Sequence, residues 1–107
     1  MEDLVSVYVT CPDAACAEAL GRLAVEERLA ACANVLPGVL ALYRWEGSLQ
    51  RDEEVALLLK TRRVLFETLA ARLQAEHPYA LPCIVAWPIA AATAAYAEWV
   101  RSSTRPA

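Results

Sequence analysis

The sequence predicts an α+β fold, and three observations support that prediction. A segment near the start alternates in polarity and is rich in β-branched residues, which is typical of a strand. Two later segments place apolar residues at helical spacing, and a long strand–turn–strand region precedes the second of them. The resulting order, β-α-β-β-α-β-α, is the split βαβ pattern of a ferredoxin-like sandwich with an antiparallel sheet and an extra C-terminal helix. The chain has 107 residues, so we expect one domain over residues 1–107.

The first strand is predicted over residues 4–10, LVSVYVT, where Val5, Val7 and Val9 share one face. Pro12 and Asp13 follow it, and both residue types are favoured where a helix begins. A helix is therefore predicted over residues 14–30. Its apolar stripe consists of four residues: Cys16, Leu20, Leu23 and Ala24.

Residues 33–61 predict two long strands around a turn. The first strand covers residues 33–46, and Pro37 with Gly38 indicates a bulge or bend inside it. Gly47 and Ser48 supply the predicted turn, and the second strand covers residues 50–61. We expect these two strands to form a long hairpin.

The last part of the chain predicts a helix, a strand and a short final helix. The helix covers residues 62–77, with an apolar stripe of Val64, Leu65, Leu69 and Leu73. The strand lies within residues 81–89 and ends at Pro88. The final helix, residues 90–103, is rich in alanine, and we expect its aromatic residues to anchor it: Tyr96 and Trp99. Residues 101–107, RSSTRPA, look like a tail.

The inner strands predict self-association. The segment VALLLK, residues 55–60, is apolar on both faces of its strand, and CIVAW, residues 83–87, is likewise two-sided. A ferredoxin-like fold covers only one face of its sheet with the two main helices, so the second apolar face needs cover. The final helix is too short to supply all of it. We therefore expect copies of the chain to associate.

Composition excludes several classes of function. The net charge is −3 and 58% of the residues are hydrophobic, so nothing favours nucleic-acid binding and a folded globular chain is expected. No apolar run reaches the roughly 18 residues of a membrane-spanning helix. The acidic start, MEDLVSVYVT, does not resemble a secretory signal. We expect a cytoplasmic protein with reduced cysteines that binds neither nucleic acid nor membrane.

The chain's single histidine, His77, lies in the segment HPYALPC between the second helix and the last strand. In a ferredoxin-like sheet the end of the first strand meets the start of the last. Cys11 stands at the former and Cys83 at the latter, so these three side chains are expected to converge. Thiolates with an imidazole favour Cu(I) or Zn(II). We expect His77 to be exposed enough to bind such a metal, with Cys83 and then Cys11 as its partners.

Other interpretations of these residues stay open. Free cysteine often packs as a small apolar residue, which is the expected role of Cys16 and Cys32, and a histidine before proline can simply end a helix. No C-x-x-C pair is present, so no metal is expected to be required for folding. A thiol enzyme would lack an orienting residue and an oxyanion hole, and a nucleotide-binding regulator would lack a glycine-rich loop. We therefore expect no enzyme.

The aromatic residues at or near the strand ends are expected in the core or at an interface, with a ligand cleft as the alternative: Tyr43, Trp45 and Trp87.

Two blocks, RLAACANVLPGVLALYRWEGSLQRDEEVALLLKT and HPYALPCIVAWPI, closely resemble the CutA family of divalent-cation tolerance proteins. The resemblance extends from VTCPD to YAEWV, which is nearly the whole chain. It implies a ferredoxin-like subunit in a tight homotrimer, with long hairpin strands exchanged between neighbours. It also implies a role in tolerance of copper and other divalent cations, copper binding, and no established catalysis. The alternative function is a structural or signalling trimer that binds a small ligand or partner protein in its inter-subunit clefts.

The resemblance also implies copper ligands. The family's cysteine after the first strand matches Cys11, and the histidine of its HPY motif matches His77. The third ligand, a glutamate, is missing, because HPYALPC replaces the usual HPYExPE and puts Ala80 and Cys83 in place of both acids. Two interpretations stay open. Cys11, His77 and Cys83 form a softer S/N/S site, or metal binding is dispensable and the trimer is the selected feature.

Overall fold

The computed structural model describes residues 3–107, which form one four-stranded sheet and three α-helices. The strands are β1 (Leu4–Cys11), β2 (Cys32–Trp45), β3 (Ser48–Arg62) and β4 (Ile84–Pro88). The helices are α1 (Ala14–Glu26), α2 (Phe66–Glu76) and α3 (Ala94–Ser103). The sheet order is β2-β3-β1-β4 with antiparallel neighbours throughout. This arrangement confirms the predicted α+β class, a ferredoxin-like sandwich with an added helix.

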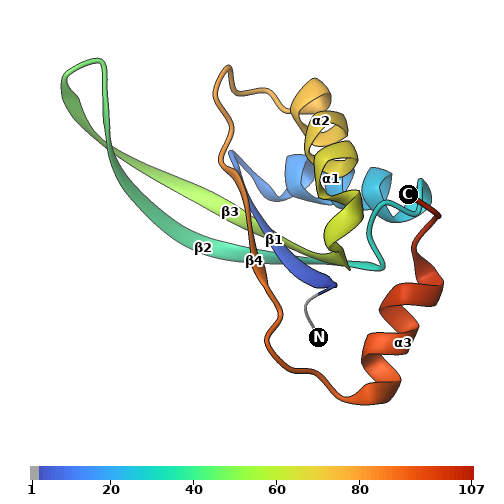
Figure 1. The fold of residues 1–107 in the computed structure, drawn as a ribbon. Helices are drawn as coiled ribbons and strands as arrows, with labels where there is room; N and C mark the ends of the chain where they lie inside the picture. The colour runs from blue at the N-terminus through green and yellow to red at the C-terminus, as the bar shows by residue number, and fades with distance from the viewer. Residues whose placement is uncertain (1–2) are drawn as a thin grey trace.

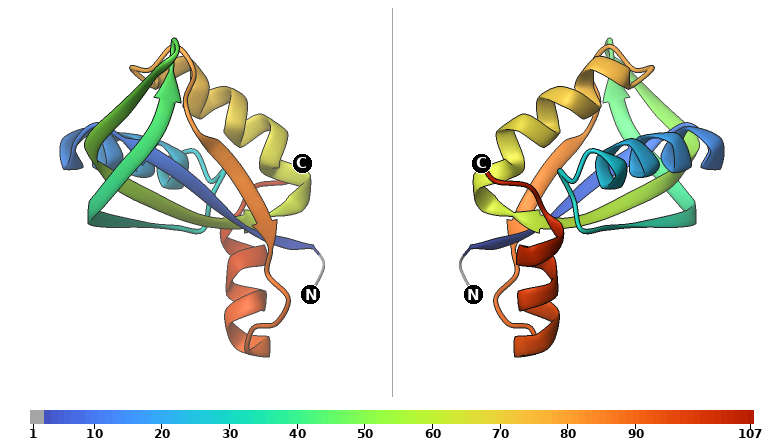
Figure 2. Two further views of the ribbon diagram at one scale, coloured as in Figure 1. Left: turned by 90° about the vertical axis from the view of Figure 1, so that its left-hand side faces the viewer. Right: turned by 90° about the vertical axis from the view of Figure 1, so that its right-hand side faces the viewer.

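Helices α1 and α2 lie together on one face of the sheet, as Figures 1 and 2 show. Strand alternation sends Val7 and Val9 of β1 and Leu57 and Leu59 of β3 toward these helices, and none of the four is exposed. Among the described residues, 3–107, no helix lies across the other face of the sheet (Figure 2). The inner strands are apolar on both faces, as predicted, but the helices of residues 3–107 cover only one of these faces.

Helix α1 begins where the sequence predicts and ends earlier. Asp13 is its N-cap and accepts a hydrogen bond on Oδ1 from the backbone N–H of Cys16 at 2.8 Å. The helix ends at Glu26 and not at residue 30, and the backbone of Arg28 is left-handed, with φ of 58°. Leu29 and Ala30, which the sequence assigned to the helix, are buried in the connection to β2.

Strands β2 and β3 form the predicted long hairpin, and its tip projects away from the rest of the subunit (Figure 1). The pairing shifts register between Leu36 and Val39, which confirms the bulge predicted at Pro37 and Gly38. The turn is one residue earlier than predicted. Glu46 and Gly47 form it, both with positive φ, as a tight two-residue hairpin turn requires.

The second helical segment is interrupted at its start. Residues 63–65 form a 3₁₀ turn, and α2 proper follows from Phe66. Leu65, Leu69 and Leu73 are buried as predicted, but Val64 is 61% exposed. The prediction for Val64 is wrong because it assumed one continuous α-helix, whose spacing does not apply within the tighter turn.

Helix α3 packs at the end of the sheet through its small residues. Ala97 and Val100 are buried against Leu4 and Ala31, whereas the residues expected to anchor the helix, Tyr96 and Trp99, are about two-fifths exposed. The expectation that residues 101–107 form a tail is also wrong, because α3 extends to Ser103 and the residues after it are held by contacts. Thr104 is buried, Arg62 Nε donates a hydrogen bond to its hydroxyl at 3.0 Å, and the Arg105 N–H donates to the Arg28 carbonyl at 2.9 Å. No helix within residues 3–107 is long and apolar enough to cross a membrane.

Candidate functional site

His77 joins β1 to the connection between α2 and β4. Its Nε2 lies 2.9 Å from the Thr10 carbonyl oxygen, and its Nδ1 accepts the backbone N–H of Tyr79 at 3.1 Å. Because Nδ1 accepts a hydrogen bond, the ring proton of the neutral imidazole is on Nε2, which donates to Thr10. The residue as a whole is only 7% exposed. The expectation that His77 is open to a metal ion is therefore wrong, since burial and two hydrogen bonds occupy the ring.

Cys11, the last residue of β1, faces the helices. It continues the alternation of Val5, Val7 and Val9, is fully buried and belongs to the main hydrophobic core. Burial, reinforced by the neighbouring thiol of Cys16, raises the pKa of Cys11 to about 12. The thiol is therefore held protonated at neutral pH, and a metal would first have to displace that proton.

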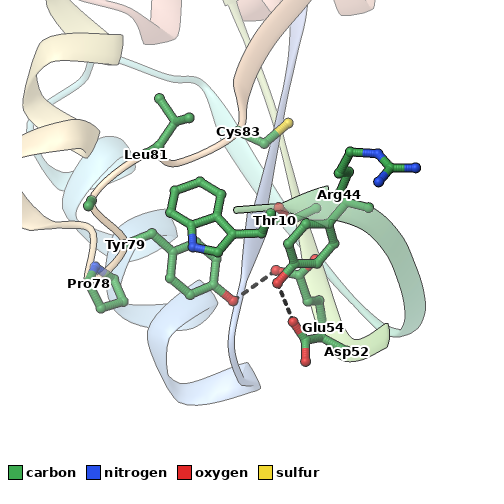
Figure 3. Close-up of a pocket in the computed structure, with 11 residues that line it drawn as sticks. Thr10, Arg44, Asp52, Glu54, Pro78, Tyr79, Leu81 and Cys83 are labelled. Carbon is green, nitrogen blue, oxygen red and sulfur yellow. Dashed lines mark hydrogen bonds between the residues drawn. The ribbon is translucent and has the colours of Figure 1, made fainter. Parts of the chain in front are cut away.

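Cys83 lies on the opposite face of the sheet from Cys11. Val9 pairs with Ile84, so Ile84 faces the helices, and the residue before it faces the other way. The Cys83 side chain is exposed and lines a pocket on that open face (Figure 3). Partial desolvation, followed by the charge of Glu54, raises the pKa of its thiol.

The three predicted metal ligands therefore do not come together within one subunit. Strand alternation separates Cys11 from Cys83, and both nitrogens of His77 have hydrogen-bond partners. Over residues 3–107, no group of three or more His, Cys, Asp or Glu side chains is arranged to hold a metal ion. Within one subunit the expected convergence is therefore not seen, and a copper or zinc site that uses these residues stays a prediction.

The open-face pocket has a volume of about 660 Å³. Its walls come from β2, β3, the end of β1 and the connection that follows His77 (Figure 3). The hairpin contributes Tyr43, Arg44 and Trp45 from β2 and two carboxylates from β3, Asp52 and Glu54. A volume of this size falls in the range of small-molecule sites, which is roughly 300–1,000 Å³.

Two phenol–carboxylate pairs organise one wall of this pocket. The Tyr79 hydroxyl donates to Glu54 Oε2 at 2.8 Å, and the Tyr43 hydroxyl donates to Asp52 Oδ2 (Figure 3). Burial and the bond to Glu54 raise the pKa of Tyr79, and the bond to Asp52 raises that of Tyr43. Both phenols therefore stay protonated and donate to carboxylates.

Sequence reasoning missed this wall. It considered Tyr43 and Trp45 as cleft residues only as an alternative, and it assigned no role to Asp52 or Glu54. A signal was present, because Tyr43, Asp52 and Glu54 all face the open side once the hairpin register is known. Tyr79 could not be found in this way, since it reaches Glu54 from a connection 25 residues further along the chain.

These features define a class of subunit: a ferredoxin-like α+β sandwich with a long projecting hairpin and a pocket at its open face. The sequence profile of the CutA1 divalent ion tolerance protein family matches residues 5–103, and the chain belongs to this family.

Relatives and solved structures agree with that assignment. The chain is 43% identical over 104 residues to the divalent-cation tolerance protein CutA of Thermus thermophilus, covering 97% of this chain and 99% of that protein. It is 42% identical to the chloroplastic protein CutA of Arabidopsis thaliana over 94% of this chain, and it spans only 56% of that protein's length. The crystal structure of CutA1 from Oryza sativa superposes with a TM-score of 0.95 at 38% identity, covering 98% of this chain and 96% of that one.

Proposed function

We propose that the chain acts in divalent-cation tolerance as a cytoplasmic homotrimer. Family membership supports the cation role, because relatives such as the Thermus thermophilus protein are named for it. The names describe tolerance and not catalysis, so we propose a non-enzymatic role. The observation that carries the assembled state is the exposed apolar surface of the projecting hairpin.

That surface is largest on one side of the hairpin. Leu40, Leu42 and Leu49 are 51%, 63% and 75% exposed, and the hairpin register puts all three on the side that continues the helix-covered face. The hairpin extends past the helices, so neither α1 nor α2 covers them (Figure 1). Fully burying one leucine stabilises by about 1.5–3 kcal/mol, so contact between copies would give a large gain.

The two edges of the sheet supply a second reason for assembly. Strands β2 and β4 are the outer strands, and long open edges attract further strands. Val85 and Trp87 of β4 are about half exposed on the open face. A trimer, which the family resemblance implies, lets the hairpin of one copy cover the edge and the open face of the next.

The cation role would include direct binding of copper or zinc. Cys83 is the ligand best placed for such binding, because its thiol is exposed. The opposite placement of Cys11 and Cys83 supports a second candidate function, in which the trimer is a scaffold that presents its pocket to a small ligand. In the scaffold role the metal ligands of one subunit do not need to converge.

Titration with Cu(I) and Zn(II) against a competing chelator separates the two functions. The metal role predicts binding that Cys83→Ser weakens at least about tenfold, because a hydroxyl is a poor ligand for soft metals. Cys32→Ser is the matched control, since Cys32 lies at the start of β2 against Tyr96 and outside the pocket. Equal metal affinity in both variants and the parent would contradict a metal site at Cys83 and favour the scaffold.

A further inference from the structure

We propose that Cys11 and Cys16 are a reactive thiol pair, which a hydroperoxide oxidises to a disulfide within one subunit. The pair joins the end of β1 to the first turn of α1, on the side of the sheet that α1 and α2 cover (Figure 2). The assembly proposed above covers the open face and the sheet edges, so this pair lies outside its contacts. The proposal does not depend on the metal role.

The two thiols are neighbours in different surroundings. Cys11 has no exposed surface, whereas Cys16 is partly exposed and packs against the same hydrophobic core. Desolvation raises the pKa of Cys16, while a hydrogen bond from the Cys11 thiol lowers it. Because Cys11 is the donor in this contact, the Cys16 sulfur is the better nucleophile of the two.

The backbone between the two cysteines keeps them together. The ring of Pro12 restricts the chain after β1, and Asp13 is the N-cap of α1. Asp13 Oδ1 accepts the backbone N–H of Cys16 at 2.8 Å, which fixes the first turn beside the end of the strand. Two reactive groups held in this way have a high effective concentration. The fold should therefore favour a bond within the pair over a bond to another molecule.

A hydroperoxide can reach Cys16 but not Cys11. Cys16 lines a hollow of about 430 Å³ between α1 and α2, together with Leu20 and the ion pair of Arg72 and Glu76, whose N–O distance is 2.8 Å. Cys11 is fully buried behind it. Cys16 is therefore the thiol that reacts with peroxide, and Cys11 is the thiol that closes the disulfide.

Hydrogen peroxide supplies the oxidising equivalents in two steps. The Cys16 sulfur attacks one peroxide oxygen, the O–O bond breaks, and the departing hydroxide takes the Cys16 thiol proton and leaves as water. The product is a sulfenic acid at Cys16. The Cys11 sulfur then attacks the Cys16 sulfur, the S–O bond breaks as the S–S bond forms, and the hydroxide leaves as a second water with the Cys11 proton. The two thiols lose two electrons, and the peroxide gains them.

The other two cysteines are placed differently. The Cys32 sulfur lies 3.4 Å from the Tyr96 hydroxyl, and Cys83 lines the open-face pocket. A zinc site at the thiol pair would need further ligands, and residues 3–107 contain no group of three His, Cys, Asp or Glu side chains arranged for a metal. A disulfide needs only the two thiols.

Peptide mapping of the whole chain after treatment with hydrogen peroxide tests the proposal. Trypsin cuts after Arg22, so Cys11 and Cys16 leave together in the peptide of residues 1–22, and Cys32 and Cys83 leave in two other peptides. After peroxide and then iodoacetamide in denaturant, we expect this peptide to be lighter than its dithiol form by two hydrogen atoms and to carry no alkyl group. Dithiothreitol should restore both alkylation sites.

Variants and an unfolded control establish the order of the steps and the role of the fold. Cys11→Ala should leave a sulfenic acid at Cys16 that dimedone labels, because the second thiol is missing. Cys16→Ser should leave Cys11 reduced, since the buried thiol has no access of its own. Cys32→Ser is the matched control and should oxidise as the parent does. The disulfide should form at least about tenfold faster in the folded parent than in urea.

Four outcomes would overturn the proposal. The first is a parent peptide 1–22 that still takes up two alkyl groups after a peroxide treatment that oxidises Cys83. The second is a disulfide from Cys16 to another chain in place of the bond to Cys11. Equal rates in the folded chain and in urea would show that the spacing in the sequence, and not the fold, brings the thiols together. Oxidation of Cys11 in Cys16→Ser at the rate of the parent pair would contradict the assigned order.

Discussion

The ring of His77 is bonded on both sides, and its Nε2 reaches the carbonyl oxygen of Thr10 across 2.9 Å. The two residues are 67 positions apart in the chain. Through this contact the end of β1 is fixed to the connection that carries Tyr79 into the pocket wall. A residue that the sequence suggested as a metal ligand therefore positions the neighbouring backbone in this subunit.

Replacing His77 should measure this structural role. His77→Ala removes two hydrogen bonds of about 0.5–1.5 kcal/mol each, so the free energy of unfolding should fall by about 1–3 kcal/mol. His77→Gln keeps an amide donor within reach of Thr10 and should recover part of the loss. Urea denaturation checks both variants. Unchanged stability in His77→Ala would show that the ring does not link the two segments.

Gly21 lies where α1 comes close to β2 and β3. A Cβ at this position would lie 2.9 Å from the Cβ of Ala33 and 3.2 Å from Leu57 Cδ1. Overpacking costs about 1–3 kcal/mol, which exceeds the gain of about 1 kcal/mol in helix propensity. Gly21→Ala should therefore lower the melting temperature.

A second substitution provides the control for Gly21. Adding Ala33→Gly removes the atom at 2.9 Å, so the double variant should be more stable than the sum of the two single changes predicts. If the change in unfolding free energy of the double variant equals the sum of the two single changes, the loss in Gly21→Ala does not come from a clash with Ala33.

The buried thiol of Cys11 should make the fold sensitive to alkali. Its pKa is about 12 in the folded chain against 9.0 for an ordinary cysteine. Between these values the unfolded chain releases a proton that the folded chain keeps. The stability that Cys11 contributes is therefore complete below pH 9 and is lost as pH rises toward 12.

The effect of Cys11 is checked by measuring the free energy of unfolding from pH 8 to 11. Thiols and tyrosine phenols lose their protons over roughly this range. Cys11→Ala should lose less stability than the parent across this range, although it starts lower because of the cavity. Cys32→Ala controls for removing a cysteine elsewhere. Parallel curves for Cys11→Ala and the parent would mean that the Cys11 thiol is not held protonated by the fold.

Local patterns account for most of the fold. Alternation identified β1, helical spacing placed the buried leucines of α2, and the Pro37–Gly38 pair located the bulge in β2. The errors arose where tertiary contacts decide. Tyr96 and Trp99 have the size of anchors, but α3 packs against Leu4 and Ala31 through Ala97 and Val100 instead.

The site was harder to predict, because strand register determines which face of the sheet each side chain lies on. Cys11 and Cys83 do meet at the same end of the sheet, as the topology predicts, yet the pairing of Val9 with Ile84 puts them on opposite faces. One residue of register would reverse this. The bond between Tyr79 and Glu54 depends in addition on the path of a loop, which no spacing in the sequence records.

Sedimentation equilibrium of the whole chain at micromolar concentration tests the central claim, that the hairpin assembles three copies. We predict a single species at three times the chain mass of 11.7 kDa. Leu42→Glu, at a side chain 63% exposed in the single subunit, should leave that subunit folded and shift the distribution toward smaller species. A parent chain that sediments with the mass of one subunit would contradict the account.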